Sequence, residues 1–219
     1  MTQPPTDNES GRADGHYFDA SPASREELVA YTIDVDGRSL ALHGAAGVFS
    51  SRGLDKATAV LLEWASHHAD EPPPGSHLLD LGCGAGPMAL TLAARHRDCT
   101  VHAIDVNERA RKVCADNARA NGLDNVVVSS PDDVDPSLRF AVIWSNPPIR
   151  VGKQALHDML ATWLARLDAE GHALLVVSKN LGADSLSQWL ASGGHPVEKM
   201  ASKKGFRVLR ASPRPAVDQ

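Results

Sequence analysis

Residues 146–149 read Asn-Pro-Pro-Ile and directly follow an apolar run, residues 140–144, that is typical of a buried strand. Each proline fixes its own φ angle and pushes the preceding residue toward extended geometry, so the backbone around Asn146 is rigid. The Asn146 amide oxygen and the neighbouring carbonyls can then accept hydrogen bonds from an exocyclic amino group and hold its nitrogen lone pair toward an electrophile. The same tetrapeptide is also compatible with a structural turn around a buried asparagine.

A glycine turn upstream adds a second chemical motif. Residues 77–81 predict a strand that runs into Gly82-Cys83-Gly84-Ala85-Gly86, and residues 88–94 predict the helix that follows. This arrangement presents backbone N–H groups and a helix N-terminus to a nucleotide-like ligand. The spacing is G-x-G-x-G, which differs from the G-x-G-x-x-G of dinucleotide binding, and Pro87 is acceptable at an early helical position.

An acidic residue ends the next predicted strand, residues 100–104. Asp105 lies about 20 residues beyond the glycines, where a carboxylate can accept hydrogen bonds from a ribose diol. Glycine turn, acidic strand end and Asn-Pro-Pro follow one another in this order. The combination favours a nucleotide-like cofactor site beside an amine site over three unrelated structural turns.

These motifs resemble those of the S-adenosylmethionine (SAM)-dependent methyltransferases, in particular the methyltransferase small domain family that includes ribosomal RNA guanine amino-group methyltransferases. The resemblance extends from Tyr17 to Ala211. The pair GVFS and NPPIRxGK is similar to a single-domain branch of the family. Besides the motifs above, the similarity rests on residues 47–50 (GVFS), 54–58 (LDKAT), 117–121, 150–153 (RVGK) and 205–209 (GFRVL).

The elements that must position these motifs alternate between strand and helix. Asp36-Gly37 predicts a hairpin between residues 31–35 and 39–43, ahead of the main sheet. Further helices are predicted at 55–69, 107–121, 153–168 and 184–191, a strand at 173–178, and a closing hairpin at 196–200 and 206–210. The longest helical pattern carries an apolar face that we assign to the core and not to a cofactor site: Leu156, Met159, Leu160, Trp163, Leu164 and Leu167.

Strand and helix alternation predicts an α/β fold with a mostly parallel sheet and a ligand crevice at the carboxyl ends of the strands. The resemblance implies a Rossmann-like class I methyltransferase with seven strands, one of them antiparallel. We expect tails at residues 1–15 and 213–219 and a single domain at 16–212, with a hairpin extension at 16–54 and the SAM-binding core at 55–212.

The resemblance also implies where SAM binds. Glycine at 82, 84 and 86 would let the backbone approach the ligand. Ser130 stands where the family usually has an acid near the adenine, and Asp132, Asp133 or packing alone are the alternatives. The predicted cofactor-binding residues are Asp80, Gly82, Cys83, Gly84, Gly86, Asp105, Val106, Asn107, Ser130 and Asn146.

The predicted catalytic residues are Asn146, Pro147, Pro148 and Ile149. Methyl transfer to an amine needs alignment and exclusion of water, so we expect neither a strong general base nor a metal. Related enzymes often have Tyr or Phe where this chain has Ile149, which can cover a base but cannot stack on it by π interactions. Phe49 either supplies that stacking or is an ordinary core residue.

The net charge of −5 argues against a surface covered with phosphate contacts. Residues 199–214 nevertheless hold six basic residues and no acid, so the closing hairpin is either an RNA-facing patch or a solvated basic surface. The predicted substrate-binding residues are Phe49, Arg150, Lys153, Lys203, Lys204 and Arg207.

Three function hypotheses follow. The leading one is a SAM-dependent methyltransferase that acts on an exocyclic amino nitrogen, with guanine in ribosomal RNA as the substrate. The second is a methyltransferase with a protein glutamine or a small-molecule amine as acceptor. The third is a non-catalytic SAM-fold RNA-binding module, which the intact glycine turn and Asn-Pro-Pro disfavour. Three cysteines without C-x-x-C spacing and an apolar-poor N-terminus predict a cytoplasmic protein without disulfides or zinc.

Overall fold

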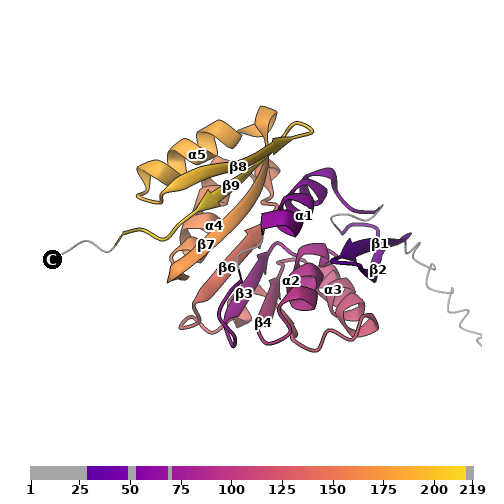
Figure 1. Ribbon diagram of the computed structural model, residues 1–219. Coiled ribbons are helices and arrows are strands. Elements are labelled where there is room, and N and C mark those ends of the chain that lie inside the picture. Colours follow the sequence, from indigo (N-terminus) through magenta and orange to yellow (C-terminus); the bar gives the residue numbers. More distant parts are fainter. Residues whose placement is uncertain (1–28, 49–52, 69–70, 216–219) are drawn as a thin grey trace, which may run out of the picture.

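The main sheet has seven strands in the order β5-β4-β3-β6-β7-β9-β8. The part from β4 to β8 can be followed in Figure 1. The structure is a computed structural model that describes residues 29–48, 53–68 and 71–215. Strand β9 runs antiparallel to both of its neighbours, and the pairs from β5 to β7 are parallel. The strands are β3 (His77–Leu81), β4 (Thr100–Ile104), β5 (Val126–Ser129), β6 (Phe140–Ser145), β7 (Leu167–Ser178), β8 (Val197–Lys203) and β9 (Phe206–Ala211). The predicted fold class is confirmed.

Helices cover both faces of this sheet. One buried cluster joins the first face to three helices and includes Leu61, Leu78 and Leu92. A second cluster joins the opposite face to the other two helices and includes Leu79 and Leu160. Neighbouring residues of β3 thus point to opposite layers, as expected for a strand that is buried on both sides. The helices are α1 (Lys56–His68), α2 (Pro87–Arg95) and α3 (Glu108–Ala120) on the first face, and α4 (Lys153–Leu164) and α5 (Ala183–Ser192) on the second.

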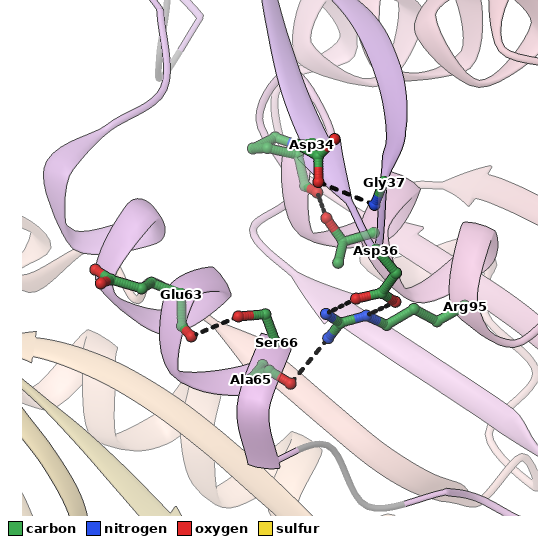
Figure 2. A network of polar contacts seen from close by, with 9 residues as sticks. Asp34, Asp36, Gly37, Glu63, Ala65, Ser66 and Arg95 are labelled. Atoms are coloured by element: carbon green, nitrogen blue, oxygen red, sulfur yellow. Dashed lines mark hydrogen bonds and ion pairs between the residues drawn. The ribbon is translucent and has the colours of Figure 1, made fainter.

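The N-terminal hairpin consists of β1 (Val29–Val35) and β2 (Arg38–Gly44) and confirms the prediction from Asp36-Gly37. Both turn residues have positive φ angles, 52° and 82°, as a two-residue turn of this kind requires. Asp36 also accepts two 2.9 Å hydrogen bonds from Arg95 of α2, whose third nitrogen donates to the Ala65 carbonyl of α1 (Figure 2). One guanidinium therefore connects the hairpin to two helices of the core.

Asn117 of α3 holds the hairpin from its other side. Its side chain exchanges hydrogen bonds with the backbone of His43 at 2.9 and 3.0 Å and donates to the Ala85 carbonyl at 2.9 Å. The side chain is buried, so these bonds satisfy polar atoms that water cannot reach. The hairpin and the glycine turn are thereby fixed to the same residue of α3.

Helix α4 is shorter than predicted. The sequence pattern extends it to residue 168, whereas the helix ends at Leu164 and β7 begins at Leu167. The Arg166 carbonyl accepts the backbone N–H of Phe140 at 2.9 Å, and its guanidinium lies over the Phe140 and Trp163 rings. The residues predicted as the last turn of the helix therefore pair with β6 instead, and Leu167 is buried as a strand residue.

Three short 3-10 helices complete the described chain: η1 (Pro131–Asp133), η2 (Ile149–Val151) and η3 (Lys179–Leu181). Each follows the carboxyl end of a strand, so all three lie along the edge where the sequence predicts the ligand crevice. Within the described ranges, no helix has the length and apolarity needed to cross a membrane.

Candidate cofactor and acceptor site

A cavity of about 530 Å³ opens at the carboxyl ends of β3, β4 and β6. Its volume lies in the range of cofactor and small-molecule sites. Residues from six separate segments line it, and most of the surface is apolar. They are Gly47, Leu81, Gly82, Ile104, Asp105, Val106, Asn107, Ala110, Pro131, Asn146, Pro148, Val151, Met159 and Trp163.

The glycine turn borders this cavity, and its glycines have different structural roles. Gly82, Gly84 and Gly86 all have positive φ angles, of 79°, 55° and 90°. A Cβ atom at Gly82 would meet no described atom within 4 Å, so the backbone there is open to a ligand. A Cβ atom at Gly86 would lie 2.5 Å from Cys114 Sγ. Gly86 thus allows close packing against α3, a role that the sequence alone does not separate from ligand contact.

Asp105 binds the turn to the end of β4. Its carboxylate accepts the Gly84 N–H and the Asn107 N–H, each at 2.9 Å. Each carboxylate oxygen keeps capacity for a further hydrogen bond, because an ionised carboxylate offers about four acceptor positions. Asn107 accepts from Arg109 N at 3.0 Å as the N-cap of α3. Val106 beside it is 84% exposed and lines the cavity.

Asp80 lies away from the cavity lining. It is 1% exposed, and its carboxylate accepts the Ala89 N–H at 2.8 Å in the first turn of α2. Gly86, the N-cap residue, has no side chain to supply that acceptor. Burial raises the pKa of Asp80 to about 7, and nearby Asp105 acts in the same direction. Asp80 thus supports the helix that follows the turn, and its contact with the cofactor stays a prediction.

Asp80→Asn should change how stability depends on pH. The folded protein keeps a proton on Asp80 up to a pH of about 7, whereas the unfolded chain releases it near pH 4, so this carboxyl destabilises the fold as pH rises through that window. Asparagine keeps an acceptor for Ala89 and carries no charge. Urea unfolding at pH 5 and pH 8 should show the variant gaining on the wild type by at most about 1.4 kcal/mol per pH unit. A stability difference that is the same at both pH values would contradict this account.

Asn146 lies next to the glycine turn across the sheet. Leu81 pairs with Ser145 in the β3–β6 register, and Ser145 Oγ donates to the Leu81 carbonyl at 2.7 Å. The residues that follow, Gly82 and Asn146, both line the cavity. Asn146 Nδ2 donates to Asp55 Oδ2 at 2.9 Å and to Thr58 Oγ1 at 3.2 Å. Its N–H donors are thus used, and among the described residues none donates to its Oδ1.

The residues after Asn146 divide between the cavity and the core. Pro147 is buried, and Pro148 and Val151 line the cavity. Ile149 packs against the second core cluster and borders a separate, small cavity near Leu181. Val151, not Ile149, is the aliphatic side chain of this segment that faces the large cavity. Phe49 and the Arg150 side chain lie outside what the structure describes.

Met159 and Trp163 of α4 also line the cavity, although the sequence pattern assigns them to the core. Trp163 is 5% exposed and belongs to the second core cluster, so it serves both surfaces. The helical spacing correctly predicts that both side chains point toward the sheet. No local pattern in the sequence indicates that this face of α4 also borders the cavity.

The segment after β5 contributes less polar surface than predicted. Ser130 Oγ donates to Asp133 Oδ2 at 2.6 Å, so two of the three candidate polar contacts to the adenine bind each other. Pro131, between them, is the residue of this segment that lines the cavity. This geometry favours apolar packing around an adenine, which is one of the alternatives left open by the sequence.

The closing hairpin consists of β8 and β9 and carries the basic residues noted above. Its turn lies at the same end of the sheet as the cavity, because Phe206 pairs with Ser178 at the carboxyl end of β7. Lys203 forms an ion pair with Glu63 of α1, and Arg207 forms one with Asp184 of α5. Lys204 in the turn and Lys153 at the start of α4 are exposed. Two of the predicted RNA contacts thus neutralise acids of the same chain.

Known proteins share the sequence pattern and the fold of this chain. Residues 39–210 match the model of the methyltransferase small domain family. The chain is 33% identical to the Bacillus subtilis protein YbxB over 199 residues, and this alignment covers 90% of the chain and 97% of YbxB. It is 35% identical over 171 residues to ribosomal RNA small subunit methyltransferase C of Pseudomonas entomophila, which covers 76% of this chain.

The chain spans about half of the length of that methyltransferase, 49%. Among solved structures it is similar to the T. thermophilus 16S rRNA N2 methyltransferase RsmC in complex with AdoMet and guanosine, with a TM-score of 0.71 and 24% identity. That match covers 85% of this chain and 51% of the solved one and supports the fold. The glycine turn, the acidic strand end and Asn-Pro-Pro thus meet in one cavity of a fold that is shared with methyltransferases, and the chain belongs to the methyltransferase small domain family of SAM-dependent enzymes.

Proposed function

We propose that this protein transfers a methyl group from SAM to the exocyclic amino nitrogen of guanine in ribosomal RNA. The observation that carries the proposal is the orientation of Asn146, whose N–H donors are bound within the protein and whose oxygen remains for an amine. The relatives named ribosomal RNA small subunit methyltransferase C support RNA as the substrate class. The T. thermophilus enzyme solved with guanosine supports the choice of base.

The residues of the cavity fit SAM. The open backbone at Gly82 allows close approach of the methionine part, and the free acceptor capacity of Asp105 suits the ribose hydroxyls. Val106, Pro131 and Trp163 would enclose the adenine by apolar contact. SAM supplies an electrophilic methyl group on a positively charged sulfur. Gly84 and Cys83 act on this part of the site through the shape of the glycine turn, and Asn107 lines the cavity beside Asp105.

The acceptor side needs two hydrogen-bond acceptors. An exocyclic amino group has two N–H donors, and Asn146 Oδ1 and the Pro147 carbonyl are the acceptors that we assign to them. With both donors held, the nitrogen lone pair points toward the methyl group. Pro148 and Val151 exclude water from the reacting atoms. The proton leaves after transfer, so the chain needs no strong base.

RNA would approach along the edge that carries the hairpin turn. Lys153 and Lys204 are the exposed predicted cations on this edge, and we assign phosphate contacts to them together with Arg150. Lys203 and Arg207 act indirectly, because they neutralise Glu63 and Asp184 that would otherwise repel phosphate.

A second candidate acceptor is a protein glutamine or a small amine. The observations on its side are the net charge of −5 and the ion pairs that already occupy Lys203 and Arg207.

Transfer of tritiated methyl groups from SAM to total RNA and to total protein separates the candidates. We expect label in the RNA fraction, at N2-methylguanine after nuclease digestion, and an initial rate of labelling that is lower by roughly a hundredfold with the Asn146→Ala variant. Label in protein or in small molecules alone would overturn RNA as the substrate. Absence of label from every fraction would support the non-catalytic SAM-fold module.

A further inference from the structure

The segment 54–58 has no role in the function proposed above, although it is one of the motifs shared with the family. Asp55 precedes α1 and accepts the N–H groups of Ala57 and Thr58 at 2.8 and 3.1 Å, which makes it the N-cap of that helix. The same oxygen, Oδ2, also accepts Asn146 Nδ2 at 2.9 Å across 91 residues of sequence. The N-cap residue of α1 is therefore also a direct neighbour of the proposed acceptor-binding amide.

Thr58 supplies a second contact from the first turn of α1. Its Oγ1 lies 3.2 Å from Asn146 Nδ2, and the residue is 2% exposed. An asparagine amide can in principle turn by 180° and exchange its oxygen with its nitrogen. A carboxylate only accepts hydrogen bonds, so Asp55 can bind the NH₂ end of Asn146 and not the oxygen end. Asp55 thus selects one of the two orientations, and in that orientation Thr58 Oγ1 accepts from the same NH₂ end.

This selection decides what the cavity offers to a ligand. With the NH₂ end held by α1, the acceptor Oδ1 is left for the donors of an amino group. In the opposite orientation, donors of Asn146 would face donors of the amine, and no hydrogen bond would form. The carboxylate also polarises the amide and makes Oδ1 more negative, which stabilises positive charge that develops on the amine nitrogen during methylation.

We propose that Asp55 is a positioning residue for methyl transfer that acts through Asn146, with Thr58 as its assistant. The inference rests on the proposed function, because it assigns to Asp55 the orientation of the amide that binds the acceptor amine. It also makes the start of α1 a part of the active site without contact to SAM or to substrate.

Three variants of Asp55 separate positioning from helix capping. Serine is a good N-cap, but its shorter side chain does not reach Asn146, so Asp55→Ser keeps the cap and loses the contact. We expect it to unfold near the wild-type temperature and to transfer methyl groups roughly thirtyfold or more slowly, with SAM affinity unchanged. Asp55→Asn keeps one acceptor oxygen without the charge and should lose less than about tenfold. Asp55→Ala should lose both transfer and helix stability.

Thr58→Val tests the second contact, and the chain offers a matched control. Thr91 of α2 is also 2% exposed, its hydroxyl donates to the Pro87 carbonyl of the same helix, and neither residue lines the cavity. Thr58→Val should slow transfer several-fold, whereas Thr91→Val should change stability only. Equal transfer rates in the two valine variants would remove Thr58 from the proposal.

A double-mutant cycle tests whether Asp55 acts through Asn146. If it does, adding Asp55→Ser to Asn146→Ala should cause little further loss of single-turnover rate, since the group to be positioned is already absent. Losses that multiply would show that Asp55 acts independently, and this would overturn the proposal. Wild-type transfer by Asp55→Ser would reduce Asp55 to a helix cap.

The orientation itself is measurable without any substrate. In ¹⁵N-labelled protein, the Asn146 side-chain amide protons should exchange slowly and should move toward solvent-like shifts in Asp55→Ser. Unchanged Asn146 signals in that variant would overturn the proposal even if activity fell. If RNA takes no label but another fraction does, the double-mutant cycle is measured with the acceptor in that fraction. Failure of the RNA assignment and failure of the positioning role of Asp55 therefore give different results.

Discussion

Replacing Asn146 by alanine should reduce single-turnover methyl transfer by roughly a hundredfold or more while SAM affinity stays near that of the wild type. The side chain supplies one of two acceptors for the amine and is held in place by Asp55 and Thr58, so its loss removes alignment at the reacting centre and leaves the cofactor side of the cavity intact. Rapid quench with labelled SAM measures the rate, and calorimetry measures the affinity. Transfer at the parental rate would show that residues 146–149 form only a rigid turn.

Asn146→Asp provides a second comparison. Its carboxylate would lie at hydrogen-bond distance from the Asp55 carboxylate, and two like charges so close raise the pKa of the pair. The variant should therefore be nearly inactive at pH 8 and should recover activity as pH falls and one proton is shared. Activity independent of pH would indicate that residue 146 and Asp55 do not interact in solution.

Gly84→Val should abolish SAM binding in a protein that still folds. Gly84 has a φ of 55° and donates its N–H to Asp105, so a β-branched residue would strain the turn and disturb the carboxylate at the end of β4. Calorimetry should detect no SAM binding, whereas the circular dichroism spectrum should remain that of the wild type.

Gly75→Val is the matched control for that experiment. Gly75 also has a positive φ, 80°, but it precedes β3 at the opposite edge of the sheet. This variant should lose stability through the same backbone strain and keep its SAM affinity. SAM affinity that is unchanged in Gly84→Val, or lost equally in both variants, would contradict the assignment of the glycine turn to the cofactor.

Local signals in the sequence were sufficient for most of the fold. Period-two and helical patterns located the strands and helices, and Asp36-Gly37 located the hairpin, because turns and amphipathic faces depend on neighbouring residues. The predicted end of α4 was wrong. Leu167 pairs with Phe140 of β6, and local patterns do not show such a contact between distant segments. The order of the motifs was likewise enough to predict the family and the edge of the sheet that carries the cavity.

The functions of individual side chains were decided only by tertiary structure. The sequence treats Gly82 and Gly86 alike, but Cys114 of a later helix makes the second one a packing residue. It treats Lys203 and Lys204 alike, but Glu63 engages the first in an ion pair. The sequence alone was enough to place an asparagine directly after β6, because the apolar strand and the two prolines that flank this residue are local signals. Which end of its amide faces the cavity was decided by Asp55, a residue 91 positions away that only the fold brings within 2.9 Å.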